Sequence, residues 1–116
     1  MLWSQGETDA GSAADAATWV ARFSSFAAAL RAELCAPSLP FVVVAITAAS
    51  AACPHLHAVR AAQLAAPDTV PHAAVVDAAG LALQADGLHL TADAAAALGS
   101  QLAAAWLGLA AAAAPS

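Results

Sequence analysis

The sequence has few charged residues, few aromatic residues and very few bases. Charged residues make up 9% of its 116 positions, aromatic residues 5%, and the formal net charge is −5. The only bases besides histidine are Arg22, Arg31 and Arg60, which form no basic stripe that could neutralise phosphates. We therefore expect no nucleic-acid partner.

Long hydrophobic runs and a leader pattern are also lacking. The longest apolar stretch, residues 102–114, is shorter than the ~18 residues that a membrane span needs, and it consists mainly of alanine. The first residues show no basic segment followed by an apolar one, so no signal peptide is visible and the compartment stays open. The sequence thus predicts no membrane segment.

Cysteine is scarce as well. Cys35 and Cys53 flank the apolar run 41–46, which would separate them by about 20 Å if that run is a strand. Since a disulfide needs Cα atoms within about 7 Å of each other, we expect two free thiols.

Alanine is abundant. It fills roughly a third of the positions and inflates the hydrophobic fraction of 62%. Because alanine buries little area per residue, the core must depend on a few large side chains. The aromatic ones are Trp3, Trp19, Phe23, Phe26, Phe41 and Trp106. A chain of this length forms one domain or part of one.

The first half of the chain alternates strands and helices. Residues 2–3 read as the end of a buried strand, and apolar residues three or four apart predict a helix over 15–34. The β-branched run 41–46 is typical of a strand buried on both faces. A second helix is expected over 54–64, which Pro67 stops.

The second half continues this alternation. A strand over 73–76 is followed by a loop over 78–90, and Thr91 is a good N-cap for a last helix. Such an order with short connections predicts an α/β fold with a parallel sheet covered on both faces. We expect residues 1–109 to belong to this domain and residues 110–116 to form a low-complexity tail.

Two polar clusters carry the chemistry that the sequence suggests. In the second cluster Asp86 stands three residues before His89, on a turn that leads into the last helix. An aspartate that accepts from His Nδ1–H fixes the tautomer and leaves Nε2 free to take a proton from a nucleophile. The alternative is an ordinary Asp-Gly turn beside an exposed histidine.

The first cluster, Gln5-Gly6-Glu7, directly follows the first strand. An amide such as that of Gln5 can donate to a developing oxyanion, and Gly6 allows the backbone to approach a substrate closely. Glu7 could hold a neighbouring loop or orient a substrate hydroxyl. The alternative is a polar turn without a function.

Together the clusters resemble the sialate O-acetylesterase-like branch of the SGNH hydrolases, which includes plant carbohydrate acetylesterases (carbohydrate esterase family six). There a strand ends in Trp-Tyr-Gln-Gly-Glu-x-Asp, and here residues 3–9 match it, with Ser4 replacing the aromatic residue. The last family motif, roughly Asp-x-Leu-His-Leu-Thr-x-x-Ala-x-x-x-Leu-Gly, matches residues 86–99. Residues 39–40 and 59–63 also match, in the correct order.

The resemblance implies removal of acetyl groups from sugar hydroxyls through an acyl-serine intermediate, without a cofactor or metal. Asp86 and His89 would be the orienting acid and the general base of a Ser-His-Asp triad. Gln5 would donate to the oxyanion, with Gly6 and Glu7 shaping the pocket for an acetylated carbohydrate. His55 and His57 could suggest a metal site, but the sequence offers no third ligand at suitable spacing.

The sequence departs from the family in one respect that bears on activity. The family nucleophile lies in a Gly-Gln-Ser-Asn turn after the first strand of the domain, and none of the serines here has that context. The resemblance therefore implies a partial three-layer α/β/α, flavodoxin-like SGNH fold with about three strands, the N-terminal strands being missing. Its first strand would then expose an edge that a partner chain could complete.

Two functions follow as hypotheses. The chain is expected to carry the base and the oxyanion side of a carbohydrate O-acetylesterase, and to be inactive alone for lack of the nucleophile. The alternative is a non-catalytic remnant of the fold that acts as a binding or interaction module.

Overall fold

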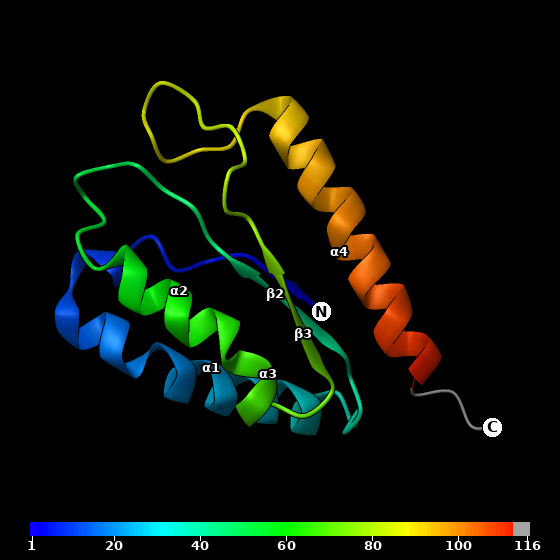
Figure 1. The fold of residues 1–116 in the computed structure, drawn as a ribbon. Helices are drawn as coiled ribbons and strands as arrows, with labels where there is room; N and C mark the ends of the chain where they lie inside the picture. Colours follow the sequence, from blue (N-terminus) through cyan, green and yellow to red (C-terminus); the bar gives the residue numbers. More distant parts are fainter. Residues whose placement is uncertain (113–116) are drawn as a thin grey trace.

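The computed structural model of the protein describes residues 1–112, and strands and helices alternate along them (Figure 1). The strands are β1 (Leu2–Trp3), β2 (Phe41–Ala45) and β3 (Ala73–Asp77). The helices are the 3-10 helix η1 (Asp9–Gly11), α1 (Ala13–Glu33), α2 (Leu56–Leu64), α3 (Ala66–Thr69) and α4 (Ala92–Ala112).

The three strands form one parallel sheet in the order β1-β2-β3. In the central strand, Val42 is in register with Leu2 on one side and with Ala74 on the other. All five residues of β2 are buried, which confirms the expected strand with both faces covered. Within residues 1–112, β1 pairs along one edge only.

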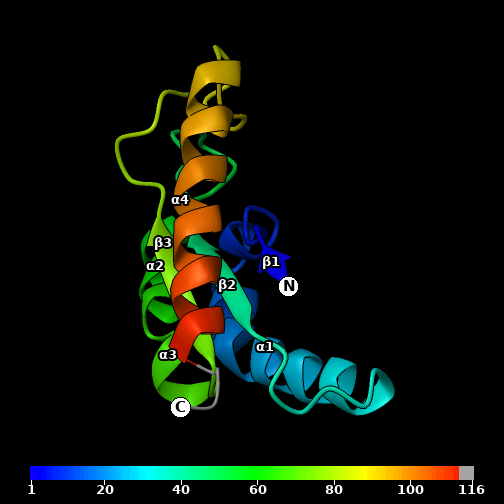
Figure 2. The ribbon, with the colours of Figure 1, turned by 90° about the vertical axis from the view of Figure 1, so that its right-hand side faces the viewer.

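Helices cover both faces of the sheet. α1, α2 and α3 lie on one face, whereas α4 crosses the opposite face (Figures 1 and 2). α1 begins after Ser12, whose hydroxyl accepts from the Asp15 N–H, as is usual for an N-cap. The result is a layered α/β fold consistent with part of an SGNH-like domain, which confirms the expected fold class.

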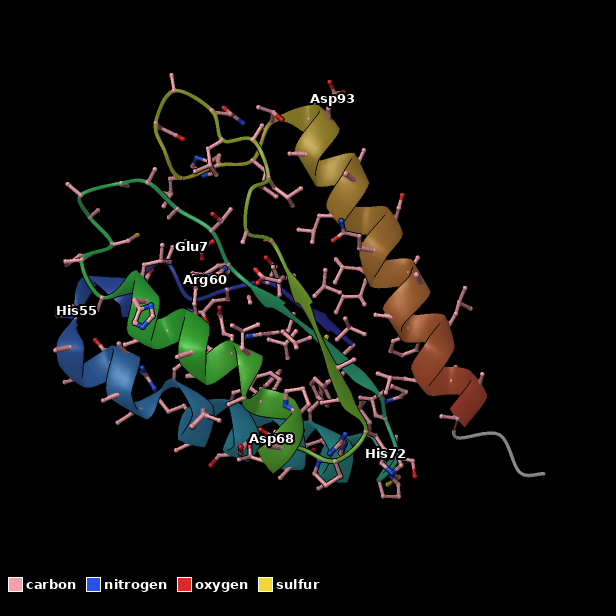
Figure 3. The ribbon with its side chains drawn as sticks, in the orientation of Figure 1. Glu7, His55, Arg60, Asp68, His72 and Asp93 are labelled. Atoms are coloured by element: carbon pink, nitrogen blue, oxygen red, sulfur yellow. The ribbon has the colours of Figure 1, made fainter. Side chains whose placement is uncertain are left out.

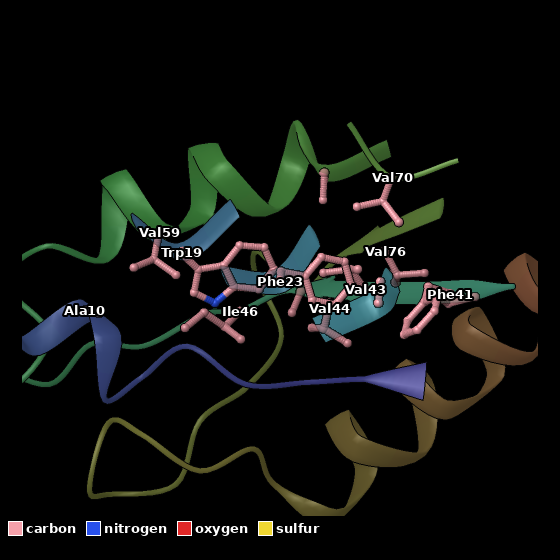
Figure 4. Close-up of a cluster of buried hydrophobic side chains, with 14 of the residues drawn as sticks. Ala10, Trp19, Phe23, Phe41, Val43, Val44, Ile46, Val59, Val70 and Val76 are labelled. Carbon is pink, nitrogen blue, oxygen red and sulfur yellow. The ribbon is translucent and has the colours of Figure 1, made fainter. Parts of the chain in front are cut away.

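The core lies between β2 and α1 (Figure 4). Phe41 of β2 is fully buried, and Phe23 of α1 meets it edge-on with ring centroids 5.7 Å apart. Trp19 stacks on Phe23 at 5.1 Å, and Phe26 meets Phe41 edge-on at 6.2 Å. Large aromatic side chains thus form the centre of the core, as the alanine-rich composition predicts.

Three details refine the sequence-based expectations. Helical structure resumes after α2, because Pro67 lies in the first turn of α3, where its missing N–H is not needed. α4 continues to Ala112, so part of the expected tail is helical, since alanine is the strongest helix former. Residues 113–116 of that tail lie outside the described residues. Cys35 and Cys53 are both free thiols, as expected.

α4 is long and apolar enough to cross a membrane, by length and composition alone. The expectation of no membrane segment rested on the uninterrupted apolar run 102–114, whereas the helix extends back to Ala92 and contains a single charged residue, Asp93. Core helices of other proteins meet the same two criteria. Here Ala94 and Leu98 of α4 are buried in the fold.

Phe41→Ala is expected to lower the free energy of unfolding by about 3–5 kcal/mol, because it leaves a cavity beneath two aromatic rings of α1. Phe26→Ala is the matched control and is expected to cost less, because the Phe26 ring is only partly buried. Urea unfolding followed by circular dichroism measures both. Equal losses would contradict the position of Phe41 at the centre of the core.

Candidate active site

Three segments meet at the carboxyl ends of the parallel strands. They are the turn after β1, the loop after β2 and the loop over 78–91 after β3 (Figure 1). Figure 3 shows Glu7 and Arg60 toward this end of the sheet, and Asp68 and His72 toward the other end. Open α/β sheets place their sites at the carboxyl ends of strands.

Asp86 and His89 form a compact unit within the loop after β3. One carboxylate oxygen, Oδ1, accepts from the backbone N–H groups of Leu88 at 2.9 Å and His89 at 3.0 Å. The other, Oδ2, lies 2.6 Å from Nδ1 of His89. Within residues 1–112 no hydrogen bond engages Nε2 of His89, so this nitrogen is free to exchange a proton.

The pair is exposed to solvent, with 46% of the Asp86 side chain and 69% of the His89 side chain accessible. Hydrogen bonds from the His89 ring and from two backbone N–H groups lower the pKa of Asp86 to about 2. The hydrogen bond to Asp86 and its negative charge raise the pKa of His89, with a smaller contribution from Glu7. Both groups are therefore charged from about pH 2 up to the raised pKa of His89. The ion pair is lost when Asp86 protonates near pH 2 or when His89 deprotonates above its ordinary range.

The turn between the two residues requires a glycine. Gly87 has φ +65°, a backbone conformation that residues with a side chain rarely adopt. An added Cβ would also lie 3.2 Å from the carbonyl carbon of Ala49. The Gly87 carbonyl accepts from the Ala49 N–H at 2.7 Å. This contact fastens the Asp86–His89 turn to the loop after β2.

His89 and Glu7 line a common cavity of about 330 Å³ on the side of the sheet that carries α4. Its other polar lining residues are Ser4, Thr47 and Gln84, and its walls are apolar side chains of β2 and α4, among them Val44 and Leu98. The structure thus brings the two polar clusters of the sequence together through Glu7 and His89. Glu7 is close enough for its charge to raise the pKa of His89.

Gln5 points away from this cavity. Its side chain lines a separate cavity of about 260 Å³ on the α1 side, where Nε2 donates to Asp9 and Oε1 accepts from Trp19 Nε1 at 3.4 Å. Side chains alternate across an extended backbone, so Ser4 shares the α4 side with Leu2 whereas Gln5 shares the α1 side with Trp3. The sequence motif alone does not reveal this separation.

A buried amide holds the turn after β1. Gln63 of α2 is fully buried, its Oε1 accepts from the Ile46 N–H at 2.9 Å, and its Nε2 donates to the Gln5 carbonyl at 2.8 Å. Gly6 packs directly beneath it with φ +149°, and an added Cβ would lie 2.7 Å from Nε2 of Gln63 and 2.9 Å from Val59. Gly6 therefore admits the close approach between the turn and α2.

An arginine joins the ends of β2 and β3. Arg60 donates to the carbonyls of Ala45 at 3.2 Å and Ile46 at 2.7 Å, and to both carboxylate oxygens of Asp77 at 2.8 and 3.1 Å. The N–H of Ala79 and then Arg60 lower the pKa of Asp77. These contacts give Arg60 and Gln63 structural roles, since each ties α2 to backbone at the strand ends.

Sequence reasoning missed several residues near the site. Ser4 and Thr47 line the His89 cavity, and Asp9 accepts from Arg22 at 2.5 Å beside Gln5. Asp9 could have been found as the last residue of the Trp-x-Gln-Gly-Glu-x-Asp pattern, whereas Thr47 and Arg22 carry no local signal. Among the described residues no three His, Cys, Asp or Glu side chains gather in a way that could hold a metal ion.

Asp86→Asn is expected to lower the pKa of His89 toward the ordinary value of about 6.5, because the carboxylate stabilises the imidazolium. Asp93→Asn removes the same charge without a bond to His89 and is the matched control. An NMR titration of the His89 ring measures both. A wild-type pKa at or below the ordinary value would contradict the Asp86–His89 hydrogen bond.

Gly6→Ala is expected to lower the free energy of unfolding by about 2–4 kcal/mol, because the new methyl group meets Gln63 and Val59 and the backbone is strained. Gly80→Ala is the control, since Gly80 also has positive φ (+79°) but no atom within 4 Å of an added Cβ. We expect it to cost about 1–2 kcal/mol, from strain alone. Urea unfolding compares the two, and an equal effect would argue against the close packing under Gly6.

The comparisons with known proteins identify the family. The family model described as carbohydrate esterase, sialic acid-specific acetylesterase, matches residues 1–108. A protein from Arabidopsis thaliana, with an X-ray structure at 1.6 Å resolution, is 38% identical and superposes with a TM-score of 0.85. The match covers 92% of this chain but only 43% of the Arabidopsis chain. No curated protein matches. The chain belongs to the carbohydrate esterase family of sialic acid-specific acetylesterases.

Proposed function

We propose that this chain supplies the acid–base pair of a serine esterase that removes acetyl groups from carbohydrate hydroxyls. The contact of 2.6 Å between Asp86 Oδ2 and His89 Nδ1 is the observation that carries the proposal. Family membership supports an acetylated carbohydrate as the substrate. The His89 cavity, at about 330 Å³, has room for an acetyl group and part of a sugar ring.

In the proposed reaction, Nε2 of His89 takes the proton of a serine hydroxyl while the serine oxygen attacks the acetyl carbonyl carbon. The bond between that carbon and the sugar oxygen then breaks, and the sugar oxygen receives the proton from His89. Water repeats the sequence on the acyl-serine and releases acetate. Asp86 stays ionised throughout, because its pKa is about 2, and stabilises the imidazolium.

The turn after β1 contributes to substrate binding in this proposal. Glu7 faces the His89 cavity and would accept from a sugar hydroxyl, and Gly6 lets the backbone approach the substrate. Gln5 uses one of its two amide protons on Asp9, so the second could serve an oxyanion if the side chain turned toward the His89 side. The oxyanion role of Gln5 thus requires a rearrangement that the roles of Glu7 and His89 do not.

The nucleophile, we propose, is supplied from outside these 116 residues. Of the serines, Ser12 caps α1, Ser50 accepts from Ala52, and Ser100 donates to Ala96 within α4. Ser4 lines the His89 cavity, but it lacks the Gly-x-Ser-Asn context in which the family's nucleophile lies.

The chain as given is expected to hydrolyse p-nitrophenyl acetate at a rate close to background, and His89→Ala is expected to leave that rate unchanged. The physical reason is that triad members act as a unit, so a base without its nucleophile retains little of the acceleration. A robust rate abolished by both His89→Ala and Ser4→Ala would identify Ser4 as the nucleophile and overturn the proposal. Ser12→Ala is the matched control.

The coding sequence upstream of Met1 distinguishes an esterase from a non-catalytic module. If an in-frame segment encodes Gly-x-Ser-Asn after a strand, the longer chain should deacetylate an acetylated sugar. His89→Ala should then reduce its rate by about 10³-fold or more. A longer chain whose turnover stays at background would favour the binding module instead.

A further inference from the structure

The loop between β3 and α4 (Figure 1) is closed into a short hairpin. Its two arms are residues 82–84 and 89–91, and an antiparallel bridge between Leu83 and Leu90 joins them. The Asp86–His89 turn forms the tip of this hairpin. The position of the His89 ring therefore depends on how firmly the two arms are held together.

Gln84 makes three hydrogen bonds inside the hairpin. Its backbone N–H donates to the His89 carbonyl at 2.7 Å, and its backbone carbonyl accepts from the Gly87 N–H at 2.9 Å. Its side-chain Nε2 donates to the Leu90 carbonyl at 2.9 Å. Within residues 1–112, no other side chain forms a hydrogen bond from one arm to the other. Gln84 thus joins the arm before the turn to the residue that directly follows His89.

The tip of the hairpin has little packing of its own. The side chains of Asp86 and His89 are 46% and 69% exposed, so hydrogen bonds rather than burial must hold them in place. The tip is joined to the loop after β2 by the bond from the Ala49 N–H to the Gly87 carbonyl. One such bond fixes a point on the turn but not its direction, which the arms must fix.

The Gln84 side chain also lines the His89 cavity. It is exposed to solvent, and the simplest alternative is a surface amide whose bond to Leu90 has no consequence for the site. Gln84 carries no charge of its own, so it can favour the charged form of His89 by keeping the ring on Asp86. This difference separates the two interpretations by experiment.

We propose that Gln84 is a positioning residue for His89, because its side chain holds the two arms of the hairpin together and so keeps the His89 ring on Asp86 at the edge of the cavity. The meaning of this role for catalysis rests on the proposed function, in which His89 is the general base. The positioning itself is a property of the 116-residue chain.

An NMR titration of the His89 ring tests the role of Gln84 in the chain as given. Gln84→Met keeps nearly the same length but has no donor. We expect the pKa of His89 to fall by about 0.3 or more, a twofold change in its ionisation constant, because the ring meets Asp86 for less of the time. The resonance of the hydrogen-bonded Nδ1 proton should broaden as well. Gln101→Met, at an exposed glutamine of α4, is the matched control and should change neither.

A double variant separates positioning from a direct effect on the ring. Asp86→Ala removes the carboxylate that Nδ1 of His89 meets, so adding Gln84→Met to it should leave the pKa of His89 unchanged. The other charge that acts on the ring, Glu7, is present in all four proteins of this cycle. Circular dichroism confirms that each variant keeps the helix content of the wild type.

Two outcomes would overturn the proposal. The first is a His89 pKa in Gln84→Met equal to that of the wild type, and the second is an equal fall with and without Asp86. Neither outcome bears on the esterase reaction, because the titration needs no nucleophile. Conversely, a longer chain that stays inactive would overturn the proposed function and leave the role of Gln84 intact.

Discussion

The candidate site depends on one buried side-chain amide. Gln63 receives the N–H of Ile46 at the end of β2 and donates to the carbonyl of Gln5 after β1, so it joins two strand ends that are distant in the sequence. Because the amide is fully buried, loss of either partner would leave an unsatisfied polar group at a cost of about 1–3 kcal/mol. The absence of a side chain at Gly6 allows α2 to approach closely enough for these bonds.

Two further contacts complete the frame. Arg60 holds the ends of β2 and β3 through two carbonyls and the carboxylate of Asp77, and Gly87 fastens the Asp86–His89 turn to Ala49. His89 is therefore held to the sheet indirectly, through the loop after β2. The turn after β1 carries Glu7, and the loop after β3 carries His89. Glu7 and His89 line one cavity because both segments are held at the same end of the sheet.

Most of the fold could be predicted from the sequence because its signals are local. The period of the apolar residues specified α1, and the β-branched run specified the buried β2. The Asp86–His89 pair could be predicted from the sequence equally well, since a turn of four residues brings the two side chains together without contacts from the rest of the chain. The residue at which α4 ends was harder to predict from the sequence, because an alanine run is compatible with both a helix and a low-complexity tail.

The sequence by itself determined the alternation of strands and helices, the two polar clusters and the pairing of Asp86 with His89, because each depends on neighbours within a few residues. Only the tertiary structure decided that Glu7 faces His89 while Gln5 faces α1. It also decided that Ser4 and Thr47 line the cavity, and that α4 presents an apolar groove beside β1. These outcomes depend on the pleat of the strand and on contacts between segments distant in the chain. Contacts of this kind produce no repeating pattern of apolar and polar residues from which they could be predicted.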